Sequence, residues 1–420
     1  MGLLILLSFL VFMLLGIPVA ITIGITSMIA LWSGGINLLM VSQRMFAGTD
    51  SFALIAVPFF ILAGDLLAKG KVSEKLVEFA DSIFGFLKGG LSVVAVLAGM
   101  FFAAISGSGA ATTAAVGSSL IPELKRKGYD EASSASLIAS AGTIGVVIPP
   151  SVPMIIYAVI AEQSVARLFL NGFFPGLLMG LALVSIAIVQ AVKRNYPTGR
   201  SPDLKNIVKT FVDAIWGLMT PVIILGGIFS GYFTPSEAAV VAVVYSMFVS
   251  LVIYRDMKLR DLYRVMVRSV TTMSVIMFII ATSAALSWVL ANWGIPGQIA
   301  AAVLSLSTEP AVVLLLVTIL ILLAGIFIET ASALIILTPV FLPLMNQLGV
   351  SLVHFGLIIV VGLAIGMITP PVAINLYVAS SITGLSMEKI TRAILPYMLG
   401  LVVVLLLIVY LPIIFPWLII

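Results

Sequence analysis

The sequence predicts an all-α polytopic membrane protein made of two inverted-topology repeats, each with a re-entrant helical hairpin and a helix broken at a Pro-Pro pair. Three observations support this fold. First, 62% of the 420 residues are apolar and 9% are charged, whereas a soluble domain has about 25% charged residues. Second, a set of prolines recurs at one spacing along the chain. Third, almost all basic residues fall on one side of the predicted spans.

The residue inventory excludes several kinds of chemistry. The chain has no Cys and a single His, His354. Disulfides, thiolate metal sites, Cys nucleophiles, HExxH zinc motifs and His-dependent triads are therefore excluded. No GxxxxGK[ST] stretch is present, so this chain does not hydrolyse ATP by a P-loop mechanism. The net charge of +4 comes from short basic loops, so it does not indicate nucleic-acid binding.

The first repeat is expected to cover residues 1–192. Its first apolar run lacks the basic flank and the cleavage site of a signal peptide, which predicts a retained helix. Residues 2–32 form one tilted helix or two short ones, and the Gly16-Ile17-Pro18 break, with a similar break at 231–235, favours two. The elements that follow from apolar runs, charge and turn signals are scaffold helices within 1–68, an interfacial arm at 72–88, a hairpin at 89–124, a broken helix at 130–161 and a helix at 168–192.

A charged cytoplasmic linker at 193–210 precedes the second repeat, which is expected to cover residues 211–420. The arms of each hairpin are too short to cross the bilayer, so each hairpin enters and leaves by one face. The predicted elements of this repeat are scaffold helices within 211–254, an arm at 255–268, a helix at 270–290, a hairpin at 311–345, a broken helix at 351–384 and a helix at 393–420.

The proline pattern indicates an internal duplication. Four prolines recur 221 positions later without any gap, as Pro122, Pro149, Pro150 and Pro175 match Pro343, Pro370, Pro371 and Pro396. Four coincidences among 20 prolines at one spacing are not expected by chance, and repeats of this kind are common in secondary transporters.

The basic residues predict that the two copies face opposite ways. If residues 125–127 are cytoplasmic, the predicted spans leave only Arg44 and Arg167 of the 21 Lys and Arg residues outside. Five spans separate the basic cluster from its equivalent, Asn346-Gln347-Leu348, which carries no charge. Because five is odd, the copies are inverted. The same count places the C-terminus outside, and two short initial helices would place the N-terminus outside as well.

The tip of the first hairpin is rich in small and hydroxylated residues. The run from Ser106 to Thr113 includes Gly107 and Gly109, which permit a tight turn. Its hydroxyl groups would lie deep in the membrane, where they need partners. Two interpretations remain open: close helix packing through small residues, and a binding site at the tip.

Each Pro-Pro pair predicts a helix that breaks near the middle of the membrane. Two successive prolines remove two amide donors and free backbone carbonyls. Carbonyl and hydroxyl oxygens are suitable ligands for Na⁺, a hard cation. The alternative is a plain kink stabilised by neighbouring Ser and Thr, and the symmetry-related occurrence at Pro149-Pro150 and Pro370-Pro371 favours ion sites.

The second hairpin carries an acidic residue, Glu329, which the proline spacing aligns with Ser108. An ionisable residue within a membrane is a candidate functional group, but a carboxylate that caps backbone amides fits equally well. The charged residues Asp65, Asp213 and Glu237 are interpreted as helix-end groups. Helix N-termini at the tips and breaks would suit an anionic substrate.

These motifs resemble the large membrane subunit of the tripartite ATP-independent periplasmic (TRAP) transporters. The resemblance rests on Val57 to Gly64, Ser106 to Thr113, Gly142 to Pro150, Glu329 to Pro343 and Gly366 to Ser380, and it extends along essentially the whole chain. It implies an elevator-type secondary transporter of the ion-transporter superfamily. It also implies about two or more Na⁺ ions and no organic cofactor.

The resemblance assigns residues to three sites. The first Na⁺ site is expected to use Ser106, Gly107, Ser108, Gly109, Gly142, Thr143, Gly145 and Pro149. The second is expected to use Gly325, Glu329, Thr330, Gly366, Thr369 and Pro370. The substrate is expected between the tips, at Ser106, Ser108, Thr112, Ser151, Thr330 and Asn375.

The resemblance further implies Na⁺-driven import of a small organic acid, such as a C4-dicarboxylate or sialic acid, across the bacterial or archaeal inner membrane. The implied partners are a small four-helix membrane subunit, expected as a separate chain, and a periplasmic binding protein that delivers the acid. A stand-alone Na⁺/dicarboxylate symporter of related fold is the alternative. An intramembrane enzyme is disfavoured because only Glu329 is a clear deep acid, and a passive scaffold would not need inverted, broken helices.

Overall fold

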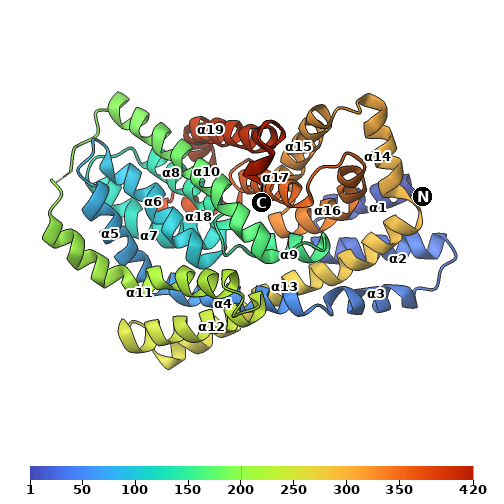
Figure 1. The fold of residues 1–420 in the computed structure, drawn as a ribbon, viewed down its shortest axis with the longest axis horizontal. Helices are drawn as coiled ribbons and strands as arrows, with labels where there is room; N and C mark the ends of the chain where they lie inside the picture. Colours follow the sequence, from blue (N-terminus) through green and yellow to red (C-terminus); the bar gives the residue numbers. More distant parts are fainter. Residues whose placement is uncertain (200, 420) are drawn as a thin grey trace.

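The computed structural model describes residues 1–199 and 201–419, and in this part the chain is helical apart from short connections (Figure 1). Among these residues, eight helices are long and apolar enough to cross a membrane. The expected all-helical, multi-span fold is therefore confirmed. Two of the eight helices, Pro310–Phe327 and Thr330–Gln347, are the arms of the second hairpin, which were expected to be too short to cross. The predicted cytoplasmic position of Arg200 and the predicted end of the last helix at Ile420 lie outside the described residues.

The first half of the chain contains the helices α1 (Gly2–Leu14), α2 (Val19–Ser33), α3 (Leu39–Thr49), α4 (Ala56–Lys69), α5 (Val72–Phe84), α6 (Gly90–Ser106), α7 (Gly109–Arg126), α8 (Glu131–Thr143), α9 (Val152–Ile160) and α10 (Val165–Lys193). The second half contains α11 (Leu204–Phe229), α12 (Pro235–Phe248), α13 (Leu259–Asn292), α14 (Ile295–Leu306), α15 (Pro310–Phe327), α16 (Thr330–Gln347), α17 (Leu352–Gly366), α18 (Ile374–Thr383) and α19 (Met387–Ile414).

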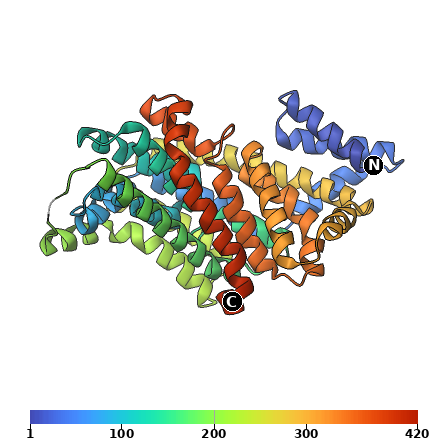
Figure 2. The same cartoon turned by 90° about the horizontal axis from the view of Figure 1, so that it is seen from above.

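The N-terminal apolar run forms two helices rather than one. Gly16 adopts a left-handed conformation with φ of 75°, and Pro18 follows it, so the chain reverses between α1 and α2. The hydroxyl of Ser33, the last residue of α2, lies 3.6 Å from the sulfur of Met1, so the two helices are antiparallel. Figure 2 shows this pair, in blue, at one end of the molecule.

The arm expected at residues 255–268 is not a separate element. Residues 259–268 instead form the first turns of α13, a continuous helix of 34 residues. At 1.5 Å per residue this helix is about 51 Å long, whereas the hydrocarbon core is about 30 Å thick. Its basic first turns therefore extend beyond the apolar layer. Two further helices, α3 and α14, were not predicted, because each is short and flanked by the turn residues of a connection.

Helix boundaries recur at the spacing of the repeated prolines. Helix α7 covers positions 109 to 126 and helix α16 covers positions 330 to 347, so both the start and the end are shifted by 221. Helices α15, α17, α18 and α19 follow α6, α8, α9 and α10 at nearly the same spacing, and α14 follows α5. The helix α13 corresponds in the same way to α3 and α4 together.

Helices α3 and α4 pack antiparallel against α13, the element to which they correspond. The Arg44 guanidinium of α3 lies 5.0 Å from the centre of the Trp288 ring near the end of α13. The Ser269 hydroxyl near the start of α13 donates to the Asp65 carboxylate of α4 over 2.6 Å. Residue numbers rise along one partner as they fall along the other, so the two elements run in opposite directions.

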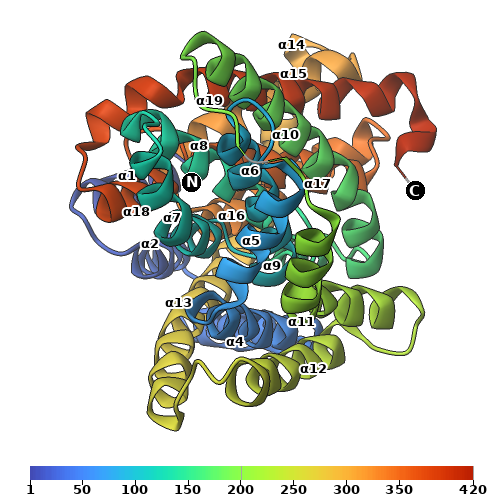
Figure 3. The ribbon, with the colours of Figure 1, turned by 90° about the vertical axis from the view of Figure 1, so that its left-hand side faces the viewer.

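The helices separate into two groups (Figures 1 and 3). Helices α12 and α13 each contact α4, and all three lie along one side of the molecule. The hairpins α6–α7 and α15–α16 and the broken helices α8–α9 and α17–α18 lie on the other side. Residues of both hairpin tips and next to both helix breaks line one cavity together with residues of α4 and α13, so they lie where these two groups meet.

Candidate functional site

The first hairpin turns at Gly107 between α6 and α7. Gly107 has φ of 58°, and a Cβ atom there would lie 2.9 Å from the Pro150 carbonyl oxygen, so glycine fits both the turn and the close approach. The Ser108 hydroxyl accepts a hydrogen bond of 3.4 Å from the Ala111 amide and caps α7. The buried hydroxyls of Ser106 and Thr112 lie 2.9 Å apart and hold the turn together.

The helix of residues 131–160 breaks at Pro149-Pro150, directly beside this turn. The chain leaves α8 through a short 3₁₀ segment and starts α9 at Val152. Ser151 caps α9, because its hydroxyl accepts from the Met154 amide over 3.4 Å. The same hydroxyl donates to the Val146 carbonyl over 2.5 Å. The break is therefore ordered by side-chain hydrogen bonds that replace those the prolines remove.

The first tip and the first break form one oxygen-rich cluster. A Cβ atom on Gly145 would lie 2.6 Å from the Thr112 hydroxyl and 2.7 Å from the Ser108 carbonyl. From the other half of the chain, Asn375 on α18 approaches this cluster, because a Cβ atom on Gly142 would lie 3.0 Å from both the Asn375 amide nitrogen and the Gly109 carbonyl oxygen. The same nitrogen donates to the Ala139 carbonyl over 3.1 Å. The Asn375 carbonyl oxygen is buried and has no hydrogen-bond partner among the described residues. A buried, unpaired oxygen on a side chain that packs against these carbonyls suits a hard cation such as Na⁺.

The second tip and the second break lie as close to each other as the first tip and the first break do. A Cβ atom on Gly366 would clash with the Gly325 carbonyl oxygen and lie only 2.6 Å from the carbonyl carbon, so α15 and α17 touch through their backbones. Glu329 caps α16, since its carboxylate accepts from the Ser332 amide over 3.1 Å. It thus has the same capping position in the second hairpin as Ser108 has in the first. The Thr369 hydroxyl donates to the Ile365 carbonyl over 2.9 Å.

A cavity of about 340 Å³ lies between the two tips, within the range of small-molecule sites. Both tips line it, from Ser106 to Ala111 and from Glu329 to Ala331. The helices α7 and α16 begin at these tips, so the positive ends of both helix dipoles open into the cavity. Unpaired amide groups at helix N-termini bind anions, so this arrangement is suited to a small organic acid.

Three of the six residues predicted to bind substrate line this cavity, namely Ser106, Ser108 and Thr330. The other three do not reach it. Thr112 bonds within the first tip, Ser151 caps α9, and Asn375 lies beside the first tip cluster. Whether any of the six binds substrate stays a prediction. The sequence marks polar residues near the breaks, but it does not tell which side of a helix faces the cavity.

The scaffold wall of the cavity was not predicted from the sequence. Asp65 on α4 and Arg268, Thr272 and Ile276 on α13 line it. Asp65 had been interpreted as a helix-end group and Arg268 as part of an interfacial arm. No local motif marks either residue. The spacing of the repeated prolines was the signal that could have found these residues. It aligns α13 with α3 and α4, and thus places α4 and α13 at the interface between the repeats.

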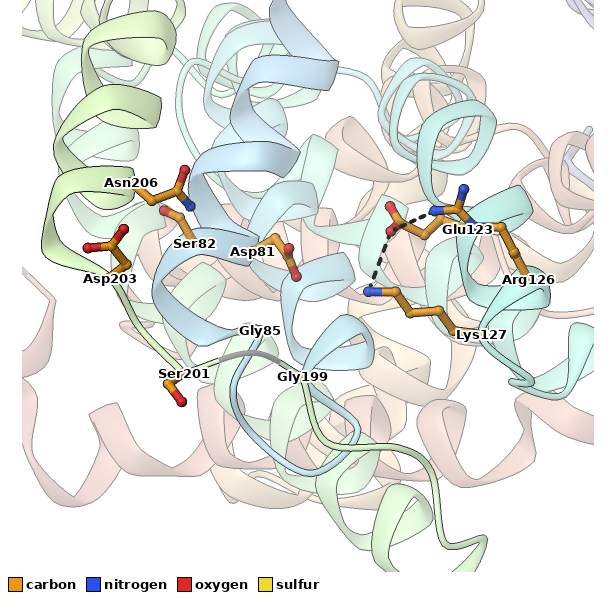
Figure 4. Close-up of a pocket in the computed structure, with 10 residues that line it drawn as sticks. All are labelled: Asp81, Ser82, Gly85, Glu123, Arg126, Lys127, Gly199, Ser201, Asp203 and Asn206. Atoms are coloured by element: carbon orange, nitrogen blue, oxygen red, sulfur yellow. Dashed lines mark hydrogen bonds and ion pairs between the residues drawn. The ribbon is translucent and has the colours of Figure 1, made fainter.

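A second, larger cavity of about 640 Å³ lies between α5, the end of α7 and the start of α11 (Figure 4). Three of its charged side chains are paired, because the Glu123 carboxylate lies 3.5 Å from the Arg126 guanidinium and 3.5 Å from the Lys127 amine. It is far along α7 from the first tip, and it contains none of the predicted site residues. Burial raises the pKa of Asp81 in this cavity, while nearby Lys127 lowers it and Glu123 raises it.

We expect the Asp81→Asn variant to be more stable than the wild type at neutral pH. A carboxyl whose pKa is raised on folding binds its proton more tightly in the folded state. The free energy of unfolding then falls as pH rises from the unfolded pKa through the folded one. Asn removes this penalty, so the difference in Tm between variant and wild type should grow from pH 4 to pH 8. A constant difference across this range would contradict the assignment.

Comparison with known proteins identifies the family. The family model described as "Tripartite ATP-independent periplasmic transporter, DctM component" matches residues 6–414. The "C4-dicarboxylate TRAP transporter large permease protein DctM" of Pseudomonas aeruginosa is 42% identical over 388 residues, which cover 90% of this chain and 91% of that protein. The "Sialic acid TRAP transporter large permease protein SiaM" of Vibrio cholerae is 35% identical, with 94% of this chain and 93% of that protein covered.

Two further similarities concern architecture. The "Isethionate TRAP transporter permease protein DctMQ" of Oleidesulfovibrio alaskensis is 39% identical over 96% of this chain, which spans 64% of that longer protein. The solved structure of the Alcanivorax borkumensis YdaH transporter has a TM-score of 0.65 at 16% identity, covering 90% of this chain and 88% of that one, and shows the fold alone. The chain therefore belongs to the DctM component family of the TRAP transporters and is a multi-pass transport permease rather than an enzyme.

Proposed function

We propose that this permease imports a small organic acid, of the C4-dicarboxylate or sialic-acid type, across the inner membrane together with two or more Na⁺ ions. The observation that carries the proposal is the convergence of two helix N-termini on one cavity. The names of the relatives support the substrate class, since they include C4-dicarboxylate and sialic acid permeases. Na⁺ is cargo in this scheme and supplies the driving force.

Each tip cluster would bind one Na⁺. The first cluster offers the backbone oxygens around Ser108 and Gly145 and the unpaired Asn375 carbonyl. The second offers the Gly325 carbonyl and the backbone freed before Pro370. Carbonyl and amide oxygens are the ligands that a hard monovalent cation prefers. Bound Na⁺ would add positive charge next to the helix N-termini and so favour binding of the acid.

An elevator mechanism is the proposed route. The hairpins and broken helices would move together against α4, α12 and α13. The recurrence of helix boundaries at one spacing, with antiparallel packing of corresponding helices, supports inverted repeats. The fused relative named DctMQ supports a small membrane subunit as partner. A periplasmic binding protein would deliver the acid. The C-terminus and the N-terminus would both lie outside.

Uptake by purified subunits in liposomes tests this proposal. We expect accumulation of the acid only with an inward Na⁺ gradient, the small subunit and an added binding protein. Uptake without a Na⁺ gradient would reject the coupling. Uptake without any binding protein would instead favour the stand-alone symporter.

A further inference from the structure

Arg268 lies on the scaffold wall of the cavity between the tips. It shares one face of α13 with Thr272 and Ile276, which follow at intervals of four positions and line the same cavity. Its side chain is exposed. Among the described residues, its guanidinium forms no hydrogen bond or ion pair, although it attracts the Asp65 carboxylate across the cavity wall.

The two acids in the cavity already have partners. The Asp65 carboxylate accepts the Ser269 hydroxyl over 2.6 Å. The Glu329 carboxylate accepts the Ser332 amide over 3.1 Å at the start of α16. An arginine without a close partner in a cavity lined by helix N-termini presents five donors in a planar fork, a geometry that matches a carboxylate or sulfonate.

The position of Arg268 is not reproduced in the other half of the chain. The proline spacing aligns it with Ala47, since 268 − 221 equals 47. Arg268 lies in the basic first part of α13, and Asp65 lies one helical turn before Lys69 at the end of α4. By the positive-inside distribution, this part of the cavity faces the cytoplasm. On the opposite, outer side of the interface between the repeats, the equivalent position would carry Ala47 in place of an arginine.

We infer that Arg268 is an anion-binding group of the scaffold that contacts the transported acid only when the cavity faces the cytoplasm. This inference rests on the proposed function and names a residue that acts after the acid has crossed. The tips hold one end of the acid in both states. In the cytoplasm-facing state the Arg268 guanidinium binds an anionic group of the acid from the scaffold side. The affinity of the permease for the acid therefore differs between the two states.

Binding to the purified permease and small subunit in phosphatidylcholine nanodiscs tests the inference, because no anionic lipid then competes for the guanidinium. The probes are succinate, malate, N-acetylneuraminate and isethionate, each titrated at saturating Na⁺ with the thermal shift as readout. For the probe that binds the wild type best, we expect about 10-fold weaker binding to Arg268→Gln and intermediate binding to Arg268→Lys.

The matched control is Arg264→Gln, one turn earlier on α13. Arg264 lies outside the cavity and 3.7 Å from Asp261, so its loss removes the same charge and an exposed ion pair of little energetic value. It should bind the probe like the wild type. Equal affinity of the wild type and Arg268→Gln would overturn the inference and leave the proposed function intact. If Arg268→Gln fails to fold, unchanged affinity of Arg268→Lys overturns it. If no probe binds the wild type, both the inference on Arg268 and the proposed function are overturned.

Discussion

Replacement of Gly366 by Ala is expected to lower uptake of the acid under a Na⁺ gradient by at least about 10-fold and to reduce the thermal stability of the permease. A methyl group at this position would clash with the Gly325 carbonyl oxygen and lie 2.7 Å from the Gly325 Cα. Both contacts are backbone atoms, so no side chain can rotate away. Overpacking of this kind costs about 1–3 kcal/mol, and here it separates the second tip from the second break. Uptake into proteoliposomes and a thermal melt measure the two effects.

Gly226→Ala is the matched control for this variant. Gly226 also lies within a long helix, α11, but no atom would come within 4 Å of its new methyl group. Alanine also favours a helix relative to glycine by about 1 kcal/mol. The control should keep wild-type uptake. Normal uptake by Gly366→Ala would contradict the close packing of α15 against α17.

Replacement of Asn375 is expected to separate its structural role from a role in Na⁺ binding. Both Asn375→Leu and Asn375→Asp lose the hydrogen bond of 3.1 Å to the Ala139 carbonyl. Only the aspartate variant keeps an oxygen where the unpaired Asn375 carbonyl lies. We expect Asn375→Leu to need at least about 10-fold more Na⁺ for half-maximal uptake, because a lost ligand in a buried site costs on the order of 1–3 kcal/mol.

Asn375→Asp should retain a Na⁺ requirement close to that of the wild type or lower, since a carboxylate is a stronger ligand for a hard cation than an amide. Uptake is measured as a function of external Na⁺ at a fixed substrate concentration. The same increase in Na⁺ requirement for both variants would show that the hydrogen bond to Ala139, and not the oxygen, is what matters.

Much of the fold follows from the sequence because the membrane restricts the possible structures. Apolar runs long enough to span the hydrocarbon core must be helical, and prolines in pairs must interrupt them. The predicted bounds 89–124, 130–161, 311–345 and 351–384 therefore lie within a few residues of helix ends in the structure. The break at Gly16-Ile17-Pro18 could not be decided from one copy, because a proline can kink a helix or end it.

The boundaries that sequence reasoning missed lie where charge and length give conflicting signals. Residues 255–268 carry several charges, which suggested an arm at the membrane surface, yet from Leu259 they continue directly into the apolar part of α13. A helix that extends beyond the bilayer keeps its regular hydrogen bonds, and water solvates its charged side chains. The short helices α3 and α14 lie in apparent connections, where composition alone resembles a loop.

Some residues of the candidate site could likewise be predicted from the sequence, and others could not. Its hairpin residues could be predicted, because glycines and hydroxyls at mid-membrane depth need a reason to be there. The cap by Glu329 could not be distinguished from an ion ligand, since both use the same carboxylate. The contributions of Asp65 and Arg268 depend on how two helices that are far apart in the sequence pack together, and no local pattern contains that information. The position of Asn375 beside the first tip depends likewise on contact between the two halves.

Simultaneous measurement of ²²Na⁺ and labelled acid uptake in the same proteoliposomes tests the central claim most directly. If the two tip clusters each bind Na⁺ while the cavity between them holds the acid, both labels should enter together at a fixed ratio of about two or more Na⁺ per acid. Entry of the acid with no accompanying ²²Na⁺ would show that these clusters are structural and that the permease is driven in another way.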